Sequence, residues 1–266
     1  MAFLVQVKDH IATLTFNRPE AMNAMDAATY RELSAAWTEV RDNPDIWVAI
    51  ITGTGDRAFT AGADLKSSSA PAVDPSTGES GSSTWRFWQT QEEMILNRGL
   101  EVWKPVIAAI NGYCLGGGMT LLFACDIRVA AEHARFGLSE VKRGILPGNG
   151  GTQRVVRQLP YPVAMELLLI GDQISAEEAL RFGLINKVVP KEQLMPAALE
   201  YAEKLCANPP LAVRAIKELA VRSQYTNLQD GLRFEGAVQR ILQQTDDARE
   251  GRKAFAEKRP AVFRGR

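Results

Sequence analysis

The sequence predicts an α/β fold, and three observations support that prediction. Patterns typical of helices alternate with short apolar runs along the chain. The apolar runs are typical of strands buried on both faces, and their alternation with helices favours parallel pairing. From about residue 196 onward only helical patterns occur. We therefore expect an α/β core over residues 1–195 and a helical C-terminal subdomain over residues 196–266.

The first elements are expected in the order strand, helix, strand. Residues 11–16 alternate apolar and polar side chains, which predicts a half-buried strand. Residues 27–41 repeat apolar side chains at helical spacing. Residues 47–51 are a continuous apolar run before two glycines, which predicts a strand buried on both faces.

A change of composition follows these elements. Thirteen of the eighteen residues over 67–84 are Ser, Thr, Gly or Pro, which predicts a mobile surface loop. Residues 85–103 then predict a helix. Its aromatic residues Trp85, Phe87 and Trp88 are candidates either for lining a ligand pocket or for packing in the core.

Two further buried strands are predicted over residues 106–110 and 127–131. A short polar turn follows the second strand, and we expect residues 134–136 to pair back on it as a hairpin.

A helix start is recognisable near residue 175. Ser175 with Glu178 matches a capping box, which predicts a helix over residues 176–182 that ends at Gly183. A short strand is expected over residues 184–189.

Composition excludes several classes of protein. The chain has 266 residues, 46% apolar and 23% charged, with a formal net charge of zero. That balance is ordinary for a globular protein and gives no broad surface for nucleic acid or an anionic membrane. Three cysteines without a C-x-x-C spacing favour a reduced, cytoplasmic location. The uncharged stretch over residues 105–125 contains Asn111, Thr120 and four glycines, so we interpret it as strand, turn and helix rather than a membrane span.

Two turns rich in small residues carry the first chemical signal. They lie over residues 59–66 and 111–119, each after a buried strand and before an expected helix. Small residues let a ligand approach the backbone, and helix-opening N–H groups favour an oxygen that gains negative charge. Two converging donors would form an oxyanion hole. Taken singly, each segment is more often a plain tight turn.

Other chemistries fit less well. Neither turn has a nucleotide-binding spacing, and residues 148–151 are expected to form a turn or a helix start. His10 and His133 are the only histidines, so we expect no metal site. Cys114 is expected to be a small buried thiol rather than a nucleophile. Proton transfer would then fall to a carboxylate, and Glu140 is the best candidate, although a single glutamate at a helix start is more often simply solvent-exposed.

Several segments together match one family. They are FNRP at 16–19, NA at 23–24, AGAD at 61–64, KPVIAAING at 104–112, GGG at 116–118, the stretch over 136–148, and FAEKR at 255–259. In these segments the chain resembles the crotonase family, the enoyl-CoA hydratase and isomerase superfamily. The resemblance covers nearly the whole chain. It implies a spiral of β-β-α units with a C-terminal helical region that builds trimers, commonly paired into hexamers.

The resemblance also implies the site. Ala63 and Gly117 would supply the two oxyanion-hole N–H groups, with Glu140 as the acid–base residue. Four groups of residues are implied to bind substrate. They are Asp64, Leu65 and Lys66 along the CoA, Thr120 near the water, Gly148 and Asn149 near the acyl group, and Phe255 and Lys258 on a neighbouring subunit's CoA. No cofactor is implied, because CoA is part of the substrate.

One departure from the family affects the expected mechanism. Hydratases of this family use two acidic residues, and the second of these positions is Thr120 here. A hydroxyl can hold water by a hydrogen bond, but it cannot serve as a carboxylate base.

Three functions remain open from the sequence. The leading hypothesis is an acyl-CoA hydratase that uses Glu140 and the oxyanion hole, and the alternative is an enoyl-CoA double-bond isomerase, which needs only one base. The third is a non-catalytic acyl-CoA-binding or RNA-binding relative. The basic run over residues 249–266 bears on it, although a solvated helix face is the favoured interpretation of that run. We expect no nucleic-acid partner and no membrane association.

Overall fold

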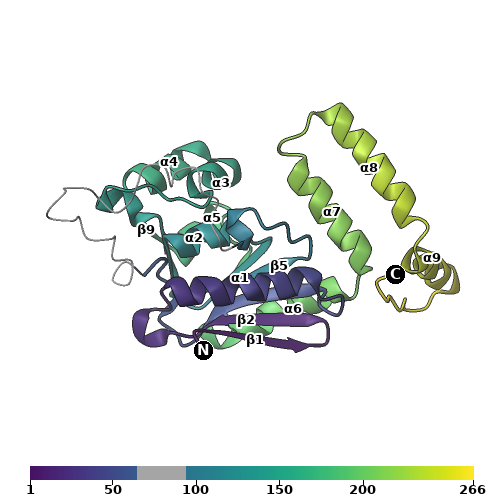
Figure 1. Cartoon of the computed structure of the whole chain (residues 1–266), viewed down its shortest axis with the longest axis horizontal. Coiled ribbons are helices and arrows are strands. Elements are labelled where there is room, and N and C mark those ends of the chain that lie inside the picture. Colours follow the sequence, from purple (N-terminus) through teal and green to yellow (C-terminus); the bar gives the residue numbers. More distant parts are fainter. Residues whose placement is uncertain (65–93) are drawn as a thin grey trace, which may run out of the picture.

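The computed structural model describes residues 1–64 and 94–266 (Figure 1). Its larger sheet has the strand order β1-β2-β3-β5-β7-β10. These strands are β1 (Phe3–Lys8), β2 (Ile11–Phe16), β3 (Val48–Gly53), β5 (Val106–Ile110), β7 (Ile127–Ala131) and β10 (Lys187–Val189). Strands β1 and β2 pair antiparallel, whereas all the later pairings are parallel. The predicted parallel α/β core is confirmed.

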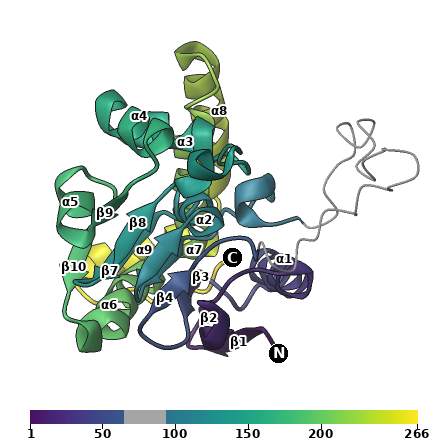
Figure 2. The ribbon, with the colours of Figure 1, turned by 90° about the vertical axis from the view of Figure 1, so that its left-hand side faces the viewer.

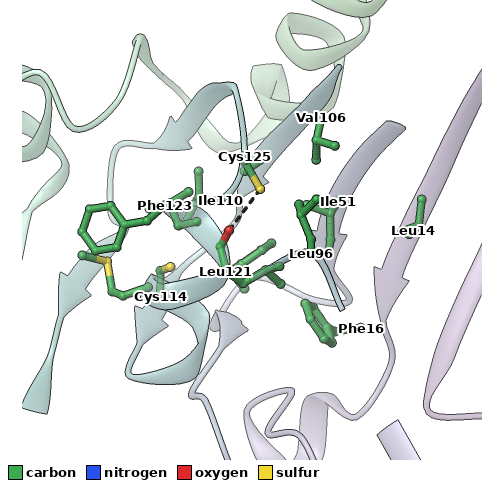
Figure 3. Packing of buried hydrophobic residues seen from close by; sticks show 14 of the residues in the cluster. Leu14, Phe16, Ile51, Leu96, Val106, Ile110, Cys114, Leu121, Phe123 and Cys125 are labelled. Atoms are coloured by element: carbon green, nitrogen blue, oxygen red, sulfur yellow. Dashed lines mark hydrogen bonds between the residues drawn. The ribbon is translucent and has the colours of Figure 1, made fainter. Parts of the chain in front are cut away.

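Helices cover both faces of this sheet. Helix α1 (Ala27–Asp42) packs on one face, and α6 (Leu194–Cys206) packs on the other. Alternation along β3 explains the arrangement, because Ile51 belongs to the α1 cluster and Ile50 to the α6 cluster. Figure 2 shows the two helices on opposite sides of the strands. Figure 3 shows the α1-side core, where the Sγ atom of Cys125 lies 3.4 Å from the carbonyl oxygen of Leu121.

A smaller sheet lies beside the larger one and carries the loops that matter for function. Its order is β4-β6-β8-β9, and β4, β6 and β8 run parallel. The strands are β4 (Ala58–Thr60), β6 (Tyr113–Leu115), β8 (Arg135–Gly137) and β9 (Gln173–Ser175). Each strand pair β3–β4, β5–β6 and β7–β8 places its first member in the larger sheet and its second in the smaller one. This repetition is the predicted β-β-α spiral.

The hairpin expected over residues 134–136 is wrong. Strand β8 pairs with β6 and β9 rather than with β7. The turn after β7 leads the chain into the smaller sheet, because that is the step that each spiral unit repeats.

The capping box at Ser175 is confirmed, with both reciprocal bonds to Glu178 present at the start of α5 (Ala176–Arg181). The next strand is shorter than expected, because the N–H of Leu184 still bonds the helix carbonyl of Ala179.

The helix expected over residues 85–103 is also wrong where the structure describes it. Residues 94–103 contain a short 3-10 helix, Leu96–Arg98, which ends at Gly99 with φ of 97°. A left-handed glycine at this point stops helical propagation. The expected loop over 67–84 and the aromatic residues Trp85, Phe87 and Trp88 lie outside the described residues.

The remaining helices are α2 (Gly117–Leu122), α3 (Gly151–Gln158), α4 (Tyr161–Leu169), α7 (Pro210–Arg222), α8 (Leu228–Leu242) and α9 (Asp246–Glu257). Helices α7, α8 and α9 extend from the core as an arm (Figure 1). Lys217 on α7 forms an ion pair with Asp126 of the core at 2.7 Å, which connects the arm to the core.

The predicted division of the chain at residue 195 stays a prediction. Within the described residues, no helix is long and apolar enough to cross a membrane.

Candidate active site

The first glycine turn continues from β4 into residues 61–64. Gly62 has φ of 89°, a conformation that favours glycine. Met25 holds the turn from both sides: its N–H donates to the carbonyl of Gly62, and its carbonyl accepts from the N–H of Asp64. The intervening N–H of Ala63 therefore points the other way, and it has no acceptor among the described residues.

The second glycine turn joins β6 to α2. Gly116 adopts φ of 51°, and its N–H donates to the carbonyl of Gly137 on β8 at 2.9 Å. Gly117 opens the helix, where an N–H has no partner within its own helix. Its N–H also has no acceptor in the part of the chain that the structure describes.

The two turns are in direct contact. A Cβ atom added to Gly62 would lie 2.7 Å from the backbone nitrogen of Gly117, which is closer than real Cβ contacts. A Cβ added to Gly117 would lie 3.4 Å from the nitrogen of Ala63. At position 62 only glycine permits this approach, because the neighbouring atoms belong to the backbone. The two N–H groups that the sequence suggested as oxyanion donors are therefore neighbours.

Glu140 lies against the second turn. It sits on a short 3-10 helix, Ser139–Arg143, directly after β8. Its Oε1 atom is 3.3 Å from the position of a Cβ on Gly116. Its Oε2 atom is buried and has no hydrogen-bond partner among the described residues. Burial raises the pKa of the Glu140 carboxyl above its ordinary value, and the Arg143 guanidinium offsets only part of that rise.

Thr120 is buried one helical turn beyond Gly116. Its hydroxyl donates to the carbonyl of Gly117 at 3.0 Å and accepts a bond from the Asn97 side-chain amide at 2.9 Å. Sequence reasoning missed Asn97. No motif marks this residue, and the helix predicted over residues 85–103 drew attention to its aromatic side chains instead.

Asn149 is held in place by two arginines. It adopts φ of 52°, which asparagine tolerates better than most residues. Its Oδ1 accepts from Arg98 at 3.1 Å, and its carbonyl accepts from Arg154 at 3.0 Å. Gly148, in the same turn, accepts a bond from the N–H of Gly151. The geometry thus fixes this turn beside Thr120, whose methyl group limits the space at Gly151.

The expected CoA residues are only partly described. Asp64 forms an ion pair with Arg18 at 3.1 Å, and Arg18 also pairs with Asp26 at 3.1 Å. This cation joins the FNRP segment to the first glycine turn. Leu65 and Lys66 lie outside the described residues.

Phe255 and Lys258 lie far from the glycine turns of their own chain. They are at the end of α9, in the arm (Figure 1). Phe255 is 87% exposed. Lys258 closes the helix with φ of 53°. Neither residue can complete the site of its own chain in this arrangement.

Three other features that the sequence analysis considered, a cysteine, a basic run and a metal site, give no sign of a functional role. Cys114 is fully buried, and burial raises the pKa of its thiol well above its usual value, so the expected inert thiol is confirmed. In the basic run over residues 249–266, Arg249 pairs with Asp246, and Arg259 pairs with two glutamates. Among the described residues there is no cluster of three or more potential metal ligands.

Comparison with known proteins gives consistent matches along the chain. A family model described as Enoyl-CoA hydratase/isomerase matches residues 6–266. The (E)-benzylidenesuccinyl-CoA hydratase of Thauera aromatica is 42% identical over 265 residues, with 100% of both chains covered. The Crotonyl-CoA hydratase of Syntrophomonas wolfei subsp. wolfei is 39% identical, with 98% of this chain and 96% of the relative covered. The enoyl-CoA hydratase crystal structure from Mycobacterium tuberculosis H37Rv aligns with a TM-score of 0.88 at 36% identity, covering 100% of this chain and 99% of that one.

Proposed function

The chain belongs to the enoyl-CoA hydratase/isomerase family and is an acyl-CoA hydratase of that family, and we propose that it adds water with one carboxylate, Glu140. The observation that carries this proposal is the convergence of three groups. The N–H groups of Ala63 and Gly117, which have no acceptor among the described residues, are neighbours, and Glu140 lies against the same glycine turn.

The proposed reaction begins with an α,β-unsaturated acyl-CoA. Its thioester oxygen accepts hydrogen bonds from Ala63 and Gly117, which stabilise the negative charge that develops there. Water attacks the β-carbon as Glu140 takes one of its protons. The electrons of the carbon–carbon double bond move to the thioester oxygen and form an enolate. Glu140 then returns the proton to the α-carbon, so one water is added and no redox partner is needed.

The environment of Glu140 suits both halves of this cycle. Since burial raises its pKa, the carboxylate is a stronger base than an exposed glutamate, and its acid form persists to higher pH. Its buried Oε2 has no partner among the described residues and is available to a substrate or a water.

Relatives narrow the substrate class. Two of them are named for the hydration of (E)-benzylidenesuccinyl-CoA and crotonyl-CoA. We propose an enoyl-CoA with the double bond next to the thioester, held along its CoA by the residues that begin at Asp64. Gly148 and Asn149 are proposed to lie near the acyl group, because their turn is fixed beside Thr120.

Assembly is part of the proposal. We propose a homotrimer, or a hexamer of two trimers, in which Phe255 and Lys258 reach the CoA of a neighbouring subunit. Their distance from the site of their own chain supports this assignment (Figure 1). We also propose a cytoplasmic location, no nucleic-acid partner and no cofactor beyond the CoA of the substrate.

Double-bond isomerisation is the competing chemistry, because a site with one carboxylate can move a proton between two carbons. The test is to incubate the enzyme with a panel of enoyl-CoA thioesters in heavy-oxygen water and to analyse the products by mass spectrometry. Hydration predicts products that gain one heavy water. Products of unchanged mass with a shifted double bond would instead establish an isomerase. If no thioester of the panel reacted, the protein would be one that binds acyl-CoA without turning it over.

A further inference from the structure

Asn97 carries a feature that the reaction above does not use. Its side chain is 4% exposed, and its Oδ1 atom has no hydrogen-bond partner among the described residues. Buried polar atoms are almost always paired, because leaving one unpaired costs free energy. An unpaired buried oxygen beside a reaction site therefore suggests that it is paired during the reaction.

The hydrogen bonds of Thr120 fix which way the Asn97 amide points. The Thr120 hydroxyl has a single proton, and it donates that proton to the carbonyl of Gly117. Toward Asn97 the hydroxyl can only accept. The amide nitrogen of Asn97 must therefore face Thr120, as observed at 2.9 Å, and Oδ1 must face elsewhere. This series of hydrogen bonds uses the only proton of the Thr120 hydroxyl and leaves Oδ1 of Asn97 without a donor among the described residues.

Asn97 and Glu140 both lie against the start of α2. Glu140 lies beside Gly116, the residue before the helix, whereas Asn97 contacts Thr120 in its first turn. The N–H of Thr120 bonds the carbonyl of Gly116, so the two residues are one turn apart. Two buried acceptors without partners in the described part of the chain, Oε2 of Glu140 and Oδ1 of Asn97, thus belong to neighbouring positions.

We propose that Oδ1 of Asn97 positions the attacking water, in place of the second carboxylate that Thr120 cannot supply. This inference rests on the proposed hydration. Water has two O–H groups: one donates to Glu140, which takes that proton, and the other donates to Asn97. A neutral amide accepts a hydrogen bond but does not take the proton, so Glu140 keeps the acid–base role alone. The water oxygen bonds the β-carbon, and the proton from Glu140 goes to the α-carbon.

The experiment compares Asn97→Leu with wild type in two reactions. The first is hydration of an enoyl-CoA, and the second is exchange of the α-protons of the matching saturated acyl-CoA with deuterated water. Exchange needs Glu140 and the oxyanion hole but no attacking water. We expect hydration kcat to fall roughly 10- to 100-fold because the water is misplaced, with exchange close to wild type. Asn208→Leu, the same change at an exposed surface asparagine, should alter neither reaction.

A second variant tests the role of the oxygen itself. Asn97→Asp keeps an acceptor for the water, and its second oxygen can accept the Thr120 proton once that hydroxyl turns away from the Gly117 carbonyl. The variant should therefore recover most of the hydration that Asn97→Leu loses. It also places a second acid near Glu140, which disfavours ionisation of both groups. The acid limb of the pH–rate profile should therefore move to higher pH, as expected if the two side chains face the same water.

The outcomes separate this inference from the proposed function. Wild-type hydration by Asn97→Leu, or equal losses of hydration and exchange, would overturn the role of Asn97. An aspartate variant with an unmoved pH profile and no recovery would also count against it. By contrast, a wild-type enzyme that exchanges α-protons but hydrates no substrate would defeat the hydratase assignment.

Discussion

The region of the two glycine turns and the arm formed by α7, α8 and α9 differ in how well each is buried within one chain. The region where the two glycine turns meet is packed within one chain, since Gly62 leaves no room for a side chain against Gly117 and Glu140 is half-buried beside them. The arm is the opposite case. Helix α8 has no buried residue, and apolar side chains such as Leu228, at 77%, and Ile241, at 68%, are exposed.

This difference in burial suggests that the glycine turns serve catalysis and that the arm serves the binding of CoA. Exposed apolar side chains on a helix without buried residues fit the proposal that the arm packs on another copy of the chain. The reacting groups that we propose all belong to one chain, whereas the CoA contacts proposed for Phe255 and Lys258 need a second copy. Changes at the glycine turns should therefore lower kcat, and changes in the arm should raise KM.

The largest effect is expected from Glu140→Gln. The amide keeps the shape of the side chain but cannot accept the proton, so hydration and α-proton exchange should both fall roughly 10²- to 10⁴-fold. Binding of CoA, measured by calorimetry, should be unchanged. Glu132→Gln, at an exposed position on the loop before β8, is the matched control and should retain full activity. Turnover by Glu140→Gln at the wild-type rate would show that another group is the base.

Ala63→Pro should have the next largest effect. Proline lacks an N–H, and the N–H of Ala63 makes no structural bond among the described residues, so the change removes an oxyanion donor with little loss of fold. We expect kcat to fall roughly 10²- to 10³-fold. Ala63→Gly keeps the N–H and should remain near wild type. If proline and glycine gave the same rate, this N–H would have no part in catalysis.

Smaller effects are expected in the arm. Phe255→Ala and Lys258→Ala should raise KM roughly tenfold with kcat unchanged, because they remove contacts made equally in the ground state and the transition state. Light scattering should show the same oligomer as wild type for both variants. A loss of kcat without a change in KM would place these residues in the chemistry and break the division between the two regions.

The smallest effect concerns stability. Because the folded pKa of Glu140 is raised, the folded protein binds more protons than the unfolded chain between the ordinary and the raised pKa. Stability therefore falls as pH rises through that window. Glu140→Gln removes this loss, so its melting temperature should exceed that of wild type at neutral pH. Thermal scans should show that the advantage disappears in acid, below the ordinary pKa of glutamate.

Much of the fold was predictable because local patterns decide it. The strands around Val48–Gly53 and Val106–Ile110 are apolar on both faces, and a short run of that kind between turns is typical of a buried strand. The failures came where pairing is decided by distant segments. Nothing near residues 134–136 indicates that β8 pairs with β6 instead of β7.

The site residues also fall into those that local sequence reveals and those that it does not. The glycine turns could be found from the sequence, because close backbone approach requires small residues and leaves a readable motif. Glu140 required the family resemblance, since a single glutamate carries no local signal. Asn97 was missed altogether. Its proposed role depends on a contact with Thr120, 23 residues away, and on an oxygen that has no partner among the described residues.

The measurement that tests the single-carboxylate mechanism most directly is the pH dependence of kcat/KM for hydration, in wild type and in Glu140→Gln. This quantity reports the ionisations of the free enzyme. Wild-type activity should decline toward acid pH along one ionisation, with a pKa above the ordinary glutamate value because Glu140 is buried. The residual activity of Glu140→Gln should lack that decline. Two acid ionisations in wild type, or the same decline in Glu140→Gln, would contradict a mechanism with Glu140 as its only acid–base residue.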